Sequence, residues 1–221
     1  MAVAMRRPGF TLWLAWVGAG ALGAAVAASA SQPGNEVFGE PGASYWAPIV
    51  LAVPLALFQF LVLVRLVGVS VVHAGMWIGV TLVASAAGVF ATSGWLFVAP
   101  EPLTRMFGVD TGMNIVFTVG DYMNPLLLGL AQGVVLAWVF GRPRNAVLWV
   151  AISVAAFAVS IRLTIFAMTA SGFDLQTVSD GYVLPRVVFA ALYAAVTGLA
   201  LVAMVKMRPR VSAPSLPHPA V

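Results

Sequence analysis

The chain has 221 residues, of which 62% are hydrophobic and 8% are charged, and its mean hydropathy is +1.01. A soluble protein of this length needs more charge to solvate its surface, so we expect an all-α integral membrane protein. The net charge of +4 does not indicate nucleic-acid binding, because the basic residues lie at the ends of apolar runs and form no continuous face. The absence of cysteine excludes disulfides, thiolate metal sites and cysteine catalysis.

Six apolar segments predict a six-helix bundle over residues 1–205. In lipid each segment must be helical, because its backbone amides find no water to bond. The short connections at residues 68–70 and 141–145 predict tight antiparallel hairpins. Residues 206–221 are rich in proline and lack an apolar period, so we expect a disordered cytoplasmic tail. The expected spans are about 10–30, 47–67, 71–97, 121–140, 146–168 and 184–205.

The first segment has two interpretations. Arg6 and Arg7, the apolar run and the small residues 28–30 resemble a signal peptide that is cleaved before Ser31. However, the run is longer than the apolar region of a signal peptide, which is about 7–15 residues. We therefore expect it to be retained as a helix, whereas cleavage would leave five helices.

Residues 99–120 are expected to form a loop between the third and fourth spans. Their apolar stretch 113–119 is too short to cross the membrane, so it is expected to lie in the interface or to form a re-entrant turn.

The basic residues lie mainly at one set of helix ends, and the acidic residues lie at or near the opposite set. Short loops rich in Lys and Arg face the cytoplasm, which predicts a bacterial cytoplasmic (inner) membrane protein with both termini inside. The basic set is Arg6, Arg7, Arg65, Arg142, Arg144, Lys206, Arg208 and Arg210, and the acidic set on the opposite side is Glu36, Glu40, Glu101, Asp110, Asp121, Asp174 and Asp180.

Alternate segments share local patterns that predict three tandem helical hairpins. The odd segments carry Trp13, Trp77 and Trp149 near their starts, and the even segments open with Tyr-x-x-Pro at residues 45–48, 122–125 and 182–185. Aligning Gln59 with Gln132 disagrees with the proline alignment by four residues. The alternative is that Trp and Tyr are interfacial anchors and Pro a first-turn residue, with no repeat.

This pattern resembles uncharacterised bacterial multi-pass membrane proteins built from recurring Ala-Gln-x-x-Val-Leu and Ala-x-x-Trp-Val helices. The matching stretches are residues 131–136 and 146–150, with looser versions at 58–63 and 74–78. The resemblance implies a helical bundle and no assigned activity.

Arg162 is the most unusual residue, because it lies inside an apolar segment, where a guanidinium is costly and by default indicates function. Its expected partners are Asp121 and Asp180. One interpretation is an outward-facing pocket for a small anionic ligand; the other is a structural ion pair at the interface. The expected pocket residues are Asp121, Tyr122, Asn124, Arg162, Tyr182 and Arg186.

Three further features lie within the apolar segments. Gln59 and Gln132 are expected to make polar contacts between helices, and a transport path is the alternative. His73 is expected to be interfacial; as a single axial ligand for haem or chlorophyll it is a less favoured alternative. The sequence Gly75-Met-Trp-Ile-Gly79 is a GxxxG pattern, which allows close helix packing inside the bundle or against another subunit.

No catalytic pattern is present: the chain lacks HExxH, a pair of intramembrane carboxylates and a Gly-rich phosphate loop. We therefore expect a non-enzymatic accessory or scaffold subunit that contacts the lipid bilayer and other membrane proteins and needs no metal or cofactor. A small-molecule binding or transport component is the alternative.

Overall fold

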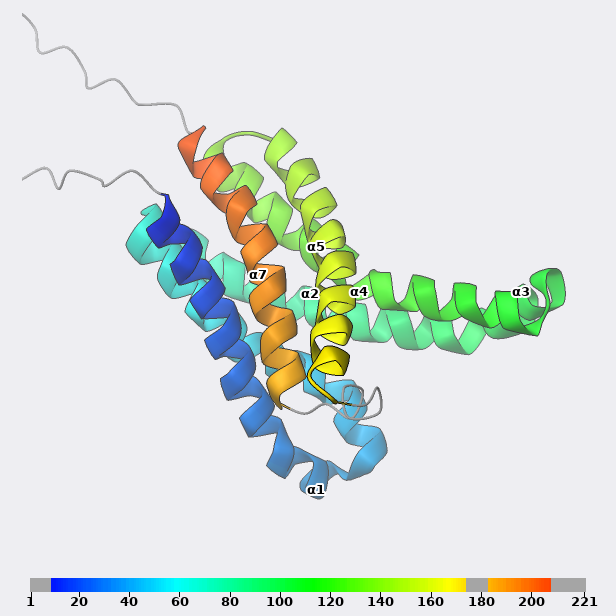
Figure 1. The fold of residues 1–221 in the computed structure, drawn as a ribbon. Helices are drawn as coiled ribbons and strands as arrows, with labels where there is room; N and C mark the ends of the chain where they lie inside the picture. Colours follow the sequence, from blue (N-terminus) through cyan, green and yellow to red (C-terminus); the bar gives the residue numbers. More distant parts are fainter. Residues whose placement is uncertain (1–8, 174–182, 208–221) are drawn as a thin grey trace, which may run out of the picture.

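The computed structural model describes residues 9–173 and 183–207, apart from the side chains of residues 30–48, 50 and 51. Within these ranges every element is helical and no strand is present, which confirms the all-α prediction for this part of the chain. The elements are α1 Phe10–Val62, the π-helical turn η1 Leu63–Val67, α2 Val71–Val98, α3 Pro100–Phe107, α4 Val109–Phe140, α5 Arg144–Ala170 and α7 Val183–Lys206 (Figure 1).

Five of the described helical stretches are long and apolar enough to cross a membrane. They are Phe10–Ser29 at the start of α1, and then α2, α4, α5 and α7. The end of α1 continues into η1 as a shorter apolar helix, Ala52–Val67, which corresponds to the second predicted span.

Helix α1 folds back on itself. A Cβ atom built on Gly23 would lie 2.6 Å from the Cα of Leu55, although 32 residues would separate these positions by about 48 Å in a straight helix. Figure 1 shows the bend at the lower end of the molecule. We expected a loop between the first two spans, and the structure instead continues helical turns around the bend.

Two short connections turn the chain at the same end of the bundle, as predicted. Gly68 ends η1 and Gly141 ends α4, with φ angles of 72° and 65°. These angles lie in the left-handed region, which glycine adopts without steric cost and which commonly terminates a helix.

Helices α2 and α4 extend beyond the bundle as a two-helix arm, with α3 at its tip (Figure 1). The arm corrects part of the prediction for residues 99–120: residues 113–119 belong to the continuous helix α4, so they form neither a loop nor a re-entrant turn. Because α4 has 32 residues, it is about 48 Å long, whereas the hydrocarbon core of a bilayer is about 30 Å thick. Asp110 lies in the first turn of α4, where a carboxylate is favourable.

The two helices of the arm are joined by side chains that donate to backbone carbonyls. The indole Nε1 of Trp95 donates to the carbonyl of Val116 at 2.8 Å, and the hydroxyl of Thr92 donates to that of Gly120 at 3.1 Å. Both donors lie on α2 and both acceptors on α4, so these bonds fix the register between the two helices.

Three buried tryptophans meet in the core of the bundle. Trp16, Trp77 and Trp149 are at most 1% exposed, and their rings pack edge to face with centroids 5.8–6.2 Å apart. Edge-to-face packing places the positive edge of one ring against the negative face of the next. The three rings come from α1, α2 and α5, so this cluster ties together helices from the whole length of the chain.

Each of these indoles also donates a hydrogen bond to a polar side chain on another helical segment. Trp16 Nε1 donates to Thr197 Oγ1 at 3.1 Å, Trp77 Nε1 to Gln59 Oε1 at 3.0 Å, and Trp149 Nε1 to Gln132 Oε1 at 3.3 Å. The Nε2 of Gln132 then donates to Thr81 Oγ1 at 3.0 Å. Buried N–H groups are costly when unpaired, so these contacts satisfy the three indole donors of the core.

Candidate functional site

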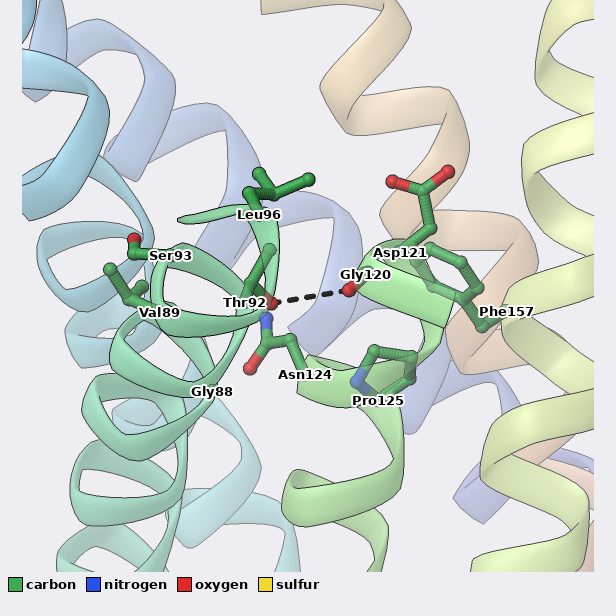
Figure 2. A pocket seen from close by; sticks show the side chains of 10 residues that line it. All are labelled: Gly88, Val89, Thr92, Ser93, Leu96, Gly120, Asp121, Asn124, Pro125 and Phe157. Carbon is green, nitrogen blue, oxygen red and sulfur yellow. Dashed lines mark hydrogen bonds between the residues drawn. The ribbon is translucent and has the colours of Figure 1, made fainter. Parts of the chain in front are cut away.

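A cavity of about 500 Å³ lies where the arm joins the bundle, between α2, α4 and α5. A cavity of this size accommodates a small organic molecule. Figure 2 shows Thr92 of α2 facing Gly120 and Asn124 of α4, with Phe157 of α5 beside Asp121. It is lined by Gly88, Val89, Thr92, Ser93, Leu96, Gly120, Asp121, Asn124, Pro125 and Phe157.

Glycine sets the distance between the two main walls. A Cβ atom on Gly88 would lie 2.3 Å from Oδ1 of Asn124, so any other residue there would push α2 and α4 apart. The Oδ1 atom is buried and has no hydrogen-bond donor within the described part of the chain. The Asn124 side-chain oxygen therefore lies against α2 without a conventional hydrogen bond.

Proline shapes the α4 wall. Pro125 lies inside α4 and has no backbone N–H, so the carbonyl of Asp121 lacks its usual donor four residues later. A proline at such a position bends a helix. Figure 1 shows α4 changing direction between the arm and the bundle, which is the level of the cavity.

Asp121 is the one charged residue of the cavity wall, and its side chain is exposed. The salt bridge found among the described residues joins Arg105 to Glu101 on α3, so Asp121 has no basic partner there. A carboxylate inside an apolar helix without a counter-ion is unusual and calls for a ligand or a cation.

The structure brings together some of the residues expected to form a pocket and separates others. Asp121 and Asn124 line the cavity, and Tyr122 packs edge to face on Phe157 of its wall, with centroids 5.5 Å apart. Arg162 is exposed on α5 and does not line the cavity. Among the other expected residues, Arg186 is half-buried on α7 and does not line it either, while Tyr182 and Asp180 lie outside the described residues.

The expected ion pair between Arg162 and Asp121 is not found in the described part of the chain. An exposed arginine on one helix and a carboxylate in a cavity formed mainly by two others have no direct contact. The sequence could not show this, because the side of a helix that faces a neighbour depends on the packing.

His73 lies at the first turn of α2 and contributes to its start. Ser70 caps the helix, and its Oγ lies 2.6 Å from Nδ1 of His73. The imidazole also packs edge to face on Trp138, with centroids 4.5 Å apart. No group of three His, Asp or Glu residues gathers as a metal site within the described ranges.

Several cavity residues were not singled out in the sequence, namely Thr92, Ser93, Leu96 and Phe157. Their residue types are common in membrane helices, and no motif marks them. Gly88, Thr92 and Leu96 are spaced four residues apart, which places them on one side of α2. This spacing was the only feature of the sequence that could have grouped them. Comparison with models of protein families, with curated proteins and with solved structures returned no match for this chain.

Proposed function

We propose that this chain is a non-enzymatic, six-helix protein of the bacterial inner membrane that acts as an accessory or scaffold subunit. The five long apolar helices and the shorter Ala52–Val67 helix support six crossings. The last part of α1 would then cross with η1, tilted or in a locally thinned bilayer, as short spans do.

In the proposed orientation both termini are cytoplasmic. Figure 1 draws the start of α1, the end of α7 and the turn between α4 and α5 at one end of the bundle. Arg142, Arg144 and Lys206 belong to these segments, and basic residues in short loops mark the cytoplasmic side. The bend of α1 lies at the other end of the bundle and would face the opposite side of the membrane, whereas the arm leaves the bundle sideways (Figure 1).

We also propose that the bundle consists of three tandem helical hairpins. The support is the pattern of the tryptophan cluster, in which the indoles of the first, third and fifth predicted spans donate to side chains of the sixth, second and fourth. Under this alignment Trp16, rather than Trp13, is equivalent to Trp77 and Trp149. Trp13 instead donates to the carbonyl of Ala195 at 2.8 Å.

The observation that carries the proposed role is the outward position of the GxxxG pattern on α2. Gly75 and Gly79 are exposed, and a Cβ atom on either would have no neighbour within 4 Å. The glycines that pack inside the bundle behave differently: a Cβ atom on Gly133, for example, would lie 2.9 Å from the carbonyl oxygen of Ala146. Gly75 and Gly79 are therefore not used for close packing against the described part of this chain.

The surface around these two glycines is apolar. Val72 and Val83 are 71% and 70% exposed, and Met76 lies between them at 42%. The spacing of three and four residues places all five on one stripe of α2. Such a stripe lets the backbone of a second membrane helix approach closely, so the partner would be a helix of another membrane protein.

The test is native mass spectrometry of the tagged full-length protein, extracted from its own membranes in a mild detergent. We expect one stoichiometric membrane-protein partner with the wild type, and its loss in the Gly75→Leu/Gly79→Leu variant. Gly94→Leu is the matched control, because Gly94 is also exposed on α2 with no neighbour within 4 Å but lies in the arm.

Two results would contradict this role. One is a wild-type protein that is recovered as a monomer or as a complex with a second copy alone. The other is a partner that remains bound to the double variant while the tryptophan cluster keeps its near-ultraviolet circular dichroism, which shows that the bundle is folded.

A further inference from the structure

The cavity at the base of the arm has the chemistry of a cation site. Its wall contains a carboxylate, Asp121, and no lysine, arginine or histidine. We propose that this cavity binds the protonated amine of a small amphiphilic molecule, with Asp121 as its counter-ion. The site is independent of the proposed packing through Gly75 and Gly79.

One further polar group can contribute to the coordination of an ammonium group. The hydroxyl of Thr92 uses its proton on the carbonyl of Gly120, so its oxygen lone pairs remain for a ligand N–H. Ser93 also lines the cavity, but Figure 2 shows its side chain on the side of α2 that faces away from Asp121, so it does not share one ammonium group with the carboxylate. A charge-assisted hydrogen bond to the carboxylate would then anchor the ammonium, and the Thr92 hydroxyl oxygen would accept another of its protons.

The rest of the cavity suits an apolar ligand body. Val89, Leu96, Pro125 and Phe157 form the non-polar part of the wall. Figure 2 shows the ring of Phe157 on the same side of the cavity as Asp121. An aromatic face near the carboxylate favours a cation further, because the ring quadrupole attracts positive charge.

An anion and a metal ion both fit this cavity less well. Arg162 and Arg186, the basic residues expected to bind an anion, do not line it. A metal ion requires several clustered ligands of the carboxylate or imidazole type, and the described residues hold no such group. A volume of about 500 Å³ is also far larger than one ion needs.

The charges of the described arm also favour a cation at this cavity. Glu101 and Asp110 belong to the arm, and Arg105 on α3 pairs with Glu101, so Asp110 and Asp121 leave the arm with a net negative charge. A concentration of one sign of charge raises the local concentration of the opposite ion and speeds its capture.

The experiment is isothermal titration calorimetry of the full-length protein in phosphatidylglycerol nanodiscs, a lipid without an amine. The probes are 2-phenylethylammonium, the neutral 2-phenylethanol and the anionic 3-phenylpropanoate. We expect saturable binding of the ammonium at least about tenfold tighter than that of the alcohol, because hydrogen bonds to charged groups are the stronger ones. No saturable binding of the ammonium, or binding of the alcohol or the carboxylate that is equally tight, would overturn the proposal.

Anionic lipid also attracts the ammonium probe. Protein variants in the same nanodiscs therefore show whether the probe binds at the cavity. Asp121→Asn keeps the shape of the side chain and should weaken binding about tenfold. Leu96→Trp fills the cavity without changing its charge and should weaken binding too. Glu101→Gln removes a carboxylate from α3 and should leave it unchanged. Unchanged affinity in either cavity variant would overturn the assignment of the site.

The amine could belong to a free molecule or to a phospholipid headgroup, and adding phosphatidylethanolamine to the nanodiscs separates these sources. If phosphatidylethanolamine displaces the ammonium probe, the site binds the amine of the lipid headgroup. If the probe binds equally well in both lipids, the site takes a free amine.

Discussion

The indole Nε1 of Trp77 donates a hydrogen bond of 3.0 Å to the side-chain oxygen of Gln59, 18 residues earlier in the chain. Both side chains are buried, and the turn at Gly68 lies between them. This single contact joins the end of α1 to the start of α2 and holds one of the three indoles of the core. It is the simplest unit of the bundle's polar interior.

Replacing the buried glutamines should destabilise the bundle unequally. Gln132→Leu leaves both Trp149 and Thr81 without a partner, so we expect a loss of about 2–3 kcal/mol in the free energy of unfolding. Gln59→Leu breaks one contact and should cost about 1–2 kcal/mol. Unfolding in dodecyl sulfate, followed by circular dichroism, measures both. Asn114→Leu, at an exposed position on α4, is the control, and equal stability of all three variants would contradict the role of the core hydrogen bonds.

The tryptophan cluster should have its own spectroscopic signature. Rings held edge to face at 5.8–6.2 Å give a strong near-ultraviolet circular dichroism signal, because they are rigid and close. Trp149→Phe should remove much of this signal. Trp138→Phe, at a side chain that is 58% exposed, should change it little. A larger loss in the Trp138 variant would show that the cluster is not packed as described.

The fold-back of α1 depends on the absence of a side chain at Gly23. Gly23→Ala introduces a Cβ atom 2.6 Å from the Cα of Leu55 and should cost about 1–3 kcal/mol of stability, because backbone must move. Gly18→Ala, also on α1, meets nothing within 4 Å and should be neutral or stabilising by up to about 1 kcal/mol. Thermal unfolding in one detergent compares the two, and a destabilisation of the Gly18 variant that equals that of the Gly23 variant would argue against the packing.

The arm should loosen when its cross-helix bond is removed. Trp95→Phe keeps the ring but loses the donor to the Val116 carbonyl, so we expect faster amide hydrogen exchange in α3 and the adjoining turns of α2 and α4. Glu101→Gln breaks the exposed pair with Arg105 on α3 and should change exchange very little, since exposed pairs contribute little. If Glu101→Gln accelerated exchange more than Trp95→Phe did, the arm would be stabilised mainly by the ion pair at its tip.

Much of the fold follows from the sequence. The apolar segments and the glycines at residues 68 and 141 predicted the helical class and two of the turns, because these depend on local hydropathy and on backbone freedom. The long α4 helix was not predicted. Residues 99–120 were expected to form a loop because their apolar stretch is too short to span a membrane, yet α4 begins at Val109, with Asp110 in its first turn, and continues through Pro125.

The candidate site was predictable only in part. Asp121 and Asn124 stood out in the sequence because polar residues are rare in an apolar segment, and both line the cavity. Their grouping with Arg162 and Arg186 depended on how the helices rotate about their axes, which no local pattern encodes. The packing of the helices therefore decided that the cavity contains an acidic side chain and no basic one.

The sequence by itself determined the helical class, the apolar segments and the separation of acidic from basic ends, since each depends on composition and neighbouring residues. The tertiary structure decided that Trp16, Trp77 and Trp149 share one core, that Gly75 and Gly79 face outward, and that Asp121 lines a cavity without a basic partner in the described chain. These relationships join residues far apart in the chain. They depend on which faces of the helices meet, and that is set by the packing of all the helices together.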